Sequence, residues 1–250
     1  MDEYANYYNL KRDLSENRLQ TKTKLKEFFN QNKDENKAKT IIRTLVHGLA
    51  DPDLPEKDKY FFQAVLYSKP ELTTRHLIGG LKVGHKTPEG GLQRVQAIKK
   101  ILVKKKLSEN EQNVRKLVAS LDDPEVAGHI SNVLAHPNYA NELTAVTLIS
   151  SLAGKQNQHA SEILSTANYG DDYLKVLQAL VLGTSSSNEK RQKSCLEILK
   201  KRINEPHVKE YLKELLDEKI ILTIFEGKHT TRKIPQKTRS LIMRLLEINK

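Results

Sequence analysis

The chain has 250 residues, of which 38% are hydrophobic and 6% aromatic, with only 11 glycines and 8 prolines, which argues against a turn-rich all-β fold. Its single cysteine, Cys195, excludes an internal disulfide, and a net charge of +11 favours anionic partners. Cys195 lies among apolar helical positions in KSCLEILKK, so we expect a buried small hydrophobe rather than a nucleophile.

The N-terminal segment MDEYANYYNLKRDLSENR lacks the apolar core of a signal peptide. No stretch of the chain approaches 18 consecutive apolar residues, so we expect no transmembrane insertion. These features predict a cytoplasmic protein, or one exported by a route that leaves no N-terminal signal.

Apolar periodicity, capping spacings and breaks predict a succession of helices along the chain. In chain order they are expected at 15–31, 36–50, 56–68, 71–82, 90–106, 109–121, 124–135, 139–153, 157–167, 171–183, 187–203, 206–217 and 235–248. Residues 218–227 are ambiguous, because IILTIF is β-prone, but a short buried helix fits the helical context better. Residues 227–239 are expected to form a loop before the last helix.

Leucine pairs spaced by four residues recur along the chain, which places both members of a pair on one helix face. Their first members are 29 to 40 residues apart, except for one interval of 64 whose midpoint is Leu180. A period of this length suits two helices and two turns, as in stacked helical repeats. The pairs are Leu10–Leu14, Leu45–Leu49, Leu77–Leu81, Leu117–Leu121, Leu148–Leu152, Leu212–Leu216 and Leu241–Leu245.

Two phrases, LVHGLADPDL (45–54) and LVASLDDPEV (117–126), repeat the same order of residue types. Each resembles the end of a first repeat helix that turns through Asp-Pro into the second helix, as in the HEAT and armadillo class of α-solenoids. The resemblance implies an all-α fold of stacked antiparallel hairpins, an extended concave surface and a protein partner. The alternative is an irregular helical bundle whose leucines only mark core faces.

The repeat reading divides the chain into a capping helix or arm (1–35), a helical-repeat core (36–217), and a C-terminal basic loop with a capping helix (218–250). Terminal repeats must cover their open apolar faces. We assign this role to Leu19, Leu25, Phe28 and Phe29 at the N-terminus, and to Ile242, Leu245 and Leu246 at the C-terminus.

Motifs for metal, nucleotide or catalytic chemistry are absent from the sequence. It contains no HExxH, CxxC, GxGxxG or Walker loop. His129 and His136, two helical turns apart, are separated by about 10 Å, too far to share one ion without other ligands. We therefore expect no cofactor, no metal and no enzyme activity.

Two basic runs are the candidate binding residues. RVQAIKKILVKKK (94–106) contains six basic residues and no acid, and three of its lysines fall off the apolar stripe. GKHTTRKIPQKTR (227–239) is the second run. A solvated face is the alternative for both runs. The candidates are Lys99, Lys100, Lys104, Lys228, Arg232, Lys233, Lys237 and Arg239.

The sequence thus favours a non-catalytic, protein-binding helical-repeat adaptor or scaffold that presents a basic groove, with an acidic protein segment as the favoured partner. The first alternative is a nucleic-acid-binding helical-repeat protein, and anionic lipid is a further partner class that the charge permits. The weaker alternative is a secreted bacterial effector.

Overall fold

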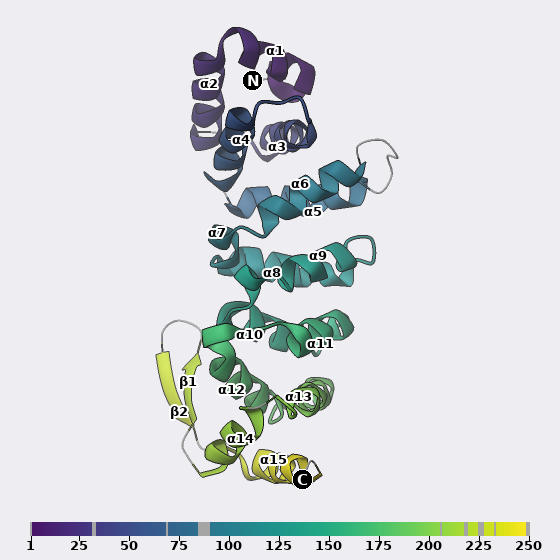
Figure 1. Ribbon diagram of the computed structural model, residues 1–250, viewed down its shortest axis with the longest axis vertical. Helices are drawn as coiled ribbons and strands as arrows, with labels where there is room; N and C mark the ends of the chain where they lie inside the picture. The colour runs from purple at the N-terminus through teal and green to yellow at the C-terminus, as the bar shows by residue number, and fades with distance from the viewer. Residues whose placement is uncertain are drawn as a thin grey trace. The chain divides into compact units, whose positions relative to one another are not determined.

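The computed structural model describes residues 2–31, 34–68, 70–84, 91–205, 207–217, 220–224, 228–232 and 234–248. Within these ranges the chain is mainly α-helical, with one antiparallel pair of strands (Figure 1). It divides into two compact units, Met1–Ser120 and Leu121–Lys250. The boundary between them lies inside the 36–217 segment that the sequence suggests as a single repeat core.

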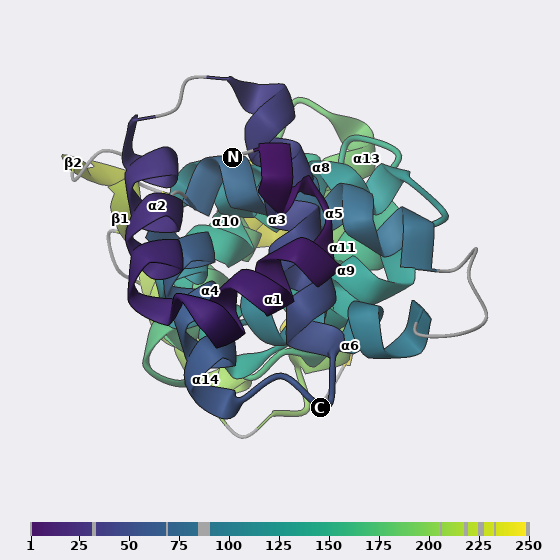
Figure 2. The same ribbon diagram turned by 90° about the horizontal axis from the view of Figure 1, so that it is seen from above.

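In the first unit, helix α3 is the central element. It packs against α1, α4, α5 and α6, and α1 lies over it in the view from above (Figure 2). Asn6, Asp34 and Asn110 cap the N-termini of α1, α3 and α8 with their side chains. The helices are a 3-10 turn (Asp2–Ala5), α1 (Tyr7–Glu16), α2 (Arg18–Gln31), α3 (Glu35–Ala50), α4 (Glu56–Ser68), α5 (Pro70–Gly84), α6 (Gly91–Leu102), α7 (Lys105–Ser108) and α8 (Glu111–Ala119).

In the second unit, successive helices pack on each other and also on the helix after next. Helix α10 contacts α11 and α12, and α11 contacts α9 and α13. Asn141 and Asn188 cap α10 and α13. The elements are α9 (Ala127–Leu134), α10 (Glu142–Ser151), α11 (Asn157–Thr166), α12 (Tyr173–Gly183), α13 (Glu189–Arg202), α14 (Val208–Asp217), β1 (Ile220–Ile224), β2 (Lys228–Arg232) and α15 (Gln236–Ile248), with short 3-10 turns at Ser120–Asp122, Pro137–Tyr139 and Gly170–Asp172.

The paired leucines lie in the cores, as the sequence predicts. All of the pair members are buried except Leu49, Leu216 and Leu241, which are half-buried. The midpoint of the long interval, Leu180, is also fully buried. The helical face that the four-residue spacing defines is therefore the buried face in both units.

The predicted helix over 90–106 is wrong in its second half, because the chain breaks at Val103 and Lys104. On a continuous helix Leu107 would lie opposite the buried stripe that Ile98 and Leu102 form. Extended backbone at Lys104 (φ −71°, ψ 137°) redirects the chain, and Leu107 becomes fully buried in the short helix α7.

The expectations of a short helix in 218–227 and of a loop in 227–239 are also wrong. Strand β1 pairs with β2 in antiparallel register from Ile220–Arg232 to Ile224–Lys228, and β1 packs against α12. Isoleucine and threonine favour strands, and an isolated strand needs a partner for its backbone groups. The IILTIF run forms a strand here because the KHTTR segment supplies the partner for its backbone groups.

The residues proposed to close the two ends are mostly buried. Leu25 and Phe29 are buried and Phe28 is half-buried, but Leu19 is 82% exposed, so its assignment is wrong. Helix α2 buries Thr21, Leu25 and Phe29, spaced by four, and Leu19 falls off this stripe. In α15, Ile242 and Leu245 are buried and Leu246 is half-buried.

Candidate functional site: a basic pocket in the first unit

The first basic run lies on α6 and the turn after it. Lys100 and Lys104 are exposed and Lys99 is half-buried. None of the three forms an ion pair with a residue that the structure describes. They are therefore free to meet an anion, but none of them lines the cavity described next.

The second basic run belongs to the second unit. Lys228 and Arg232 are the end residues of β2, and Lys237 and Arg239 lie in the first turn of α15. Lys233 lies outside the described residues. Each run is thus placed within its own unit, and the expectation of one shared basic groove stays a prediction.

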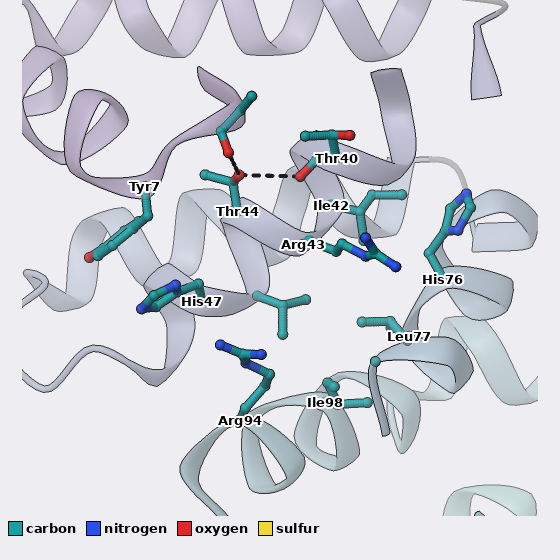
Figure 3. A pocket seen from close by; sticks show the side chains of 13 residues that line it. Tyr7, Thr40, Ile42, Arg43, Thr44, His47, His76, Leu77, Arg94 and Ile98 are labelled. Carbon is teal, nitrogen blue, oxygen red and sulfur yellow. Dashed lines mark hydrogen bonds between the residues drawn. The ribbon is translucent and has the colours of Figure 1, made fainter. Parts of the chain in front are cut away.

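A cavity of about 430 Å³ opens between α3, α5 and α6 of the first unit, and the start of the chain supplies one wall (Figure 3). This volume falls in the range of pockets that hold small ligands or single large side chains. None of the described residues that line it is acidic. They are Ala5, Tyr7, Thr40, Ile42, Arg43, Thr44, Val46, His47, His76, Leu77, Gly80, Arg94 and Ile98.

Helix α3 supplies a polar stripe to this pocket. Thr40, Arg43, Thr44 and His47 follow the i, i+3, i+4, i+7 spacing that places residues on one helix face. Thr44 is buried, and its hydroxyl lies 3.1 Å from the Ala5 carbonyl oxygen and 3.2 Å from that of Thr40. The side chain of Thr44 therefore attaches the start of the chain to α3 beside the pocket.

Tyr7 forms the wall next to His47. The two rings are stacked with centroids 4.8 Å apart, and the Tyr7 hydroxyl donates a 2.6 Å hydrogen bond to Asp51 Oδ2. Lys11 Nζ donates to the same oxygen at 2.7 Å. Burial, followed by the hydrogen bond to Asp51, raises the pKa of Tyr7 well above its usual range, so Tyr7 stays protonated and keeps donating.

Gly48 makes room for this wall. A Cβ at this position would lie 2.5 Å from Phe62 Cε2 and 2.7 Å from Tyr7 Cε2, closer than side chains tolerate. The absence of a side chain thus lets Phe62 of α4 and Tyr7 of α1 both approach α3.

The floor of the pocket is apolar. Leu77 and Ile98 are buried, and Val46 and Ile42 from α3 line the same space. Helices α5 and α6 approach closely here, since a Cβ on Gly80 would lie 2.9 Å from Ile98 Cδ1. The pocket therefore combines an apolar floor with a polar, basic rim.

Two arginines provide the fixed positive charge. Arg43 extends from α3 and Arg94 from α6, and both border the same space (Figure 3). Neither forms an ion pair with an acid that the structure describes. Unpaired guanidinium groups beside a cavity are well suited to bind carboxylate or phosphate oxygens.

Two histidines, His47 and His76, also line the pocket, and neighbouring groups shift the pKa of each ring. Burial, and then the positive charge of Arg94, lowers the pKa of His47, although Asp51 acts in the opposite direction. Burial, and then Lys39, Arg75 and Arg43, lowers the pKa of His76 against the opposing charge of Glu35. His76 Nε2 is buried and has no hydrogen-bond partner among the described residues. Both rings are thus predominantly neutral at pH 7 and could gain a proton beside an anion.

The described residues offer no arrangement typical of metal or thiol chemistry. They contain no group of three or more His, Cys, Asp or Glu side chains that could hold a metal ion. Cys195 is buried as predicted, and burial raises the pKa of its thiol to about 12. Such a thiol is a packing residue.

The pocket uses one residue of the predicted basic run, Arg94, but not the three lysines assigned from it. Sequence reasoning missed Arg43, His47 and His76. The signal for the first two was the polar stripe within RTLVHG, where Thr and Arg or His recur at helical spacing beside the leucine face. For His76 no local signal exists, because only the packing of α5 on α3 brings it there.

Comparisons of the chain with protein-family models, curated proteins and solved structures give no match. Among the helices that the structure describes, none has both the length and the apolar character needed to cross a bilayer.

Proposed function

We propose that the chain is a non-catalytic, helical-repeat adaptor that binds an acidic segment of a partner protein at the basic pocket of its first unit. The observation that carries the proposal is the pocket lining: four basic side chains, Arg43, His47, His76 and Arg94, surround an apolar floor, and no described lining residue is acidic. An anionic segment would find there the guanidinium groups of Arg43 and Arg94, which form no ion pair with an acid that the structure describes.

The contacts of the second unit support the repeat architecture, a HEAT- or armadillo-like solenoid. In stacked hairpins each helix touches its hairpin partner and its equivalent in the next hairpin. Helices α10 to α13 follow that pattern, because α10 contacts α12 and α11 contacts α13. Solenoids of this kind commonly present elongated surfaces to partner proteins, which agrees with an adaptor role.

Nucleic acid binding is the second candidate. The net charge of +11 and the exposed lysines on α6 and the following turn favour it. A phosphate backbone would engage spread surface lysines, whereas an acidic peptide side chain would enter the pocket. The two functions therefore depend on different residues of the same unit.

A titration with two polyanions separates the candidates. We expect a glutamate-rich peptide to bind at low salt and a single-stranded oligonucleotide to bind more weakly. Replacing Lys99, Lys100 and Lys104 with Glu should reduce oligonucleotide binding strongly and peptide binding only slightly. Tighter oligonucleotide binding in the unmodified protein would favour the second candidate, and the absence of binding to either polyanion at low salt would contradict both.

A further inference from the structure

His47 differs from the other basic residues of the pocket because it combines a titratable charge with access to solvent. Arg43 and Arg94 stay protonated across the physiological pH range. His76 keeps its Nε2 buried, without a hydrogen-bond partner among the described residues. The side chain of His47, by contrast, is exposed and lines the cavity. A ligand in the pocket can therefore reach this ring and change its protonation.

Three features of the surroundings favour a positive charge on the His47 ring. It lies in the last turn of α3, where the helix dipole stabilises cations. The ring of Tyr7 stacks on it with centroids 4.8 Å apart, and an aromatic face attracts a cation at such a distance. The carboxylate of Asp51, at the C-cap of α3, acts in the same direction. Stabilising contacts for a protonated His47 are thus already in place.

Arg94 supplies the charge that opposes this proton. It extends from α6, lines the same cavity as His47, and forms no ion pair with an acid that the structure describes (Figure 3). Partial burial of the ring, and then the guanidinium of Arg94, lowers the pKa of His47 in the free protein. An acidic side chain bound at Arg94 would offset that charge and attract the His47 proton, so the ring is easier to protonate in the complex.

The other titratable and charged groups near this ring come from α1, from α5, and from α3 with its C-cap. Lys11 pairs with Asp51, and Tyr7 donates a hydrogen bond to the same carboxylate. The pKa values of Lys11 and Tyr7 are raised and that of Asp51 is lowered, so all three keep their charge state near neutral pH. Arg43 and His76 line the cavity beside them. Of these groups only His76 can titrate near neutral pH, and it therefore needs its own control.

Resting on the adaptor function proposed above, we infer that His47 is the proton-sensing residue of the pocket: it takes up a proton when an acidic side chain of the partner binds beside Arg94. Because the complex then holds this proton more tightly than the free protein does, affinity for the partner rises as the pH falls through the range in which the bound ring titrates. It stops rising once the free ring is protonated as well.

The affinity for a glutamate-rich peptide at pH 8 and at pH 5.5, at constant ionic strength, tests this inference. The glutamates of the peptide stay mostly ionised at both pH values, because their ordinary pKa is about 4.3. We expect the unmodified protein to bind at least about fivefold more tightly at pH 5.5, since a rise of one in the pKa of a linked group corresponds to a gain of about tenfold. The His47→Gln variant should keep less than about twofold of this dependence. The matched His76→Gln variant should behave like the unmodified protein, and thermal melts verify that both variants are folded.

A histidine NMR titration gives a second readout on the unmodified protein. The His47 signal is assigned by its loss from the spectrum of His47→Gln, and its pKa is measured with and without saturating peptide. We expect the peptide to raise this pKa. In the free protein, Arg94→Gln should also raise it, because this change removes the opposing charge.

The outcomes separate the inference from the function on which it rests. Peptide binding that is equally tight at both pH values, or a His47 pKa that the peptide does not raise, would overturn proton sensing but leave the adaptor function standing. A pH dependence that persists in His47→Gln would overturn the assignment to this residue. An unchanged His47 pKa in Arg94→Gln would overturn the coupling through Arg94. Failure of the peptide to bind at either pH at low salt would overturn both the inference and the proposed function.

Discussion

The phrases LVHGLADPDL and LVASLDDPEV fold into the same turn. In the first, the backbone N–H of Asp53 donates to Asp51 Oδ1 at 2.9 Å, and in the second that of Glu125 donates to Asp123 Oδ1 at 3.1 Å. The aliphatic residue that ends each phrase, Leu54 or Val126, is buried. The shared letters therefore specify a shared Asp-Pro turn, fixed by the aspartate side chain.

The phrases differ where the pocket is built. His47 and Gly48 in the first correspond to Ala119 and Ser120 in the second. His47 lines the pocket and Gly48 admits Tyr7, whose hydroxyl binds Asp51 through the carboxylate oxygen that the turn leaves available. Two differences within the repeated phrase, His47 and Gly48, thus place the first turn beside the pocket.

The largest expected effect on stability comes from the buried leucine that begins both phrases. Leu45 and Leu117 hold the same place in each phrase and both are fully buried. Leu45→Ala and Leu117→Ala should each lower the free energy of unfolding by about 2–5 kcal/mol, through lost apolar burial and the cavity left behind. Denaturant unfolding of both variants measures this. A loss below about 1 kcal/mol at either position would show that the phrase is not anchored in a core there.

The next largest effect on stability comes from the additional contacts of the turn in the first phrase. Asp51→Ala removes the turn hydrogen bond and also the partner of Tyr7 and Lys11, whereas Tyr7→Phe removes only the hydroxyl that donates to Asp51. We expect Asp51→Ala to cost about 1 kcal/mol more than Tyr7→Phe, the net contribution of a typical hydrogen bond. Unfolding curves of the two variants give the difference, and equal losses would mean that the turn bond and the contact with Lys11 add nothing to stability.

A smaller effect follows from the ionisation of Asp51. Burial disfavours its charge, but the hydrogen bonds from Lys11 and Tyr7 outweigh this and lower its pKa from 3.8 to about 2. The folded state therefore releases this proton more readily than the unfolded state does. The resulting stabilisation is complete above about pH 4 and is lost as the pH falls toward 2. The stability difference between the unmodified protein and Asp51→Asn should shrink across this interval, and a constant difference would contradict the assignment.

The sequence predicts most of the helices and their buried faces, because local periodicity and capping residues determine both. Leu45, Leu117, Leu148 and Leu180 lie where their spacing places them. The helix Tyr7–Glu16 lies before the first expected helix, although the pair Leu10–Leu14 marks its buried face.

The pocket was less predictable because its residues come from distant positions. Arg94 stands out in a basic run, but its facing partner Arg43 is isolated in the sequence, and only the packing of α3 on α6 brings the two helices together. The run of lysines gave the stronger local signal, although Lys100 and Lys104 are simply exposed. Local charge density thus identifies solvent-facing positions more readily than it identifies a cavity.

The central claim is that the pocket, rather than the overall positive charge, binds the acidic partner. Two double variants test it directly: Arg43→Gln with Arg94→Gln, and Lys99→Gln with Lys100→Gln, each of which removes two positive charges from the first unit. The measurement is the affinity for a glutamate-rich peptide at physiological salt. If the pocket binds the peptide, the arginine pair loses affinity by at least about tenfold and the lysine pair by less than about twofold, because guanidinium groups at a cavity bind anions more strongly than dispersed surface charges. Equal losses for the two pairs would contradict the claim.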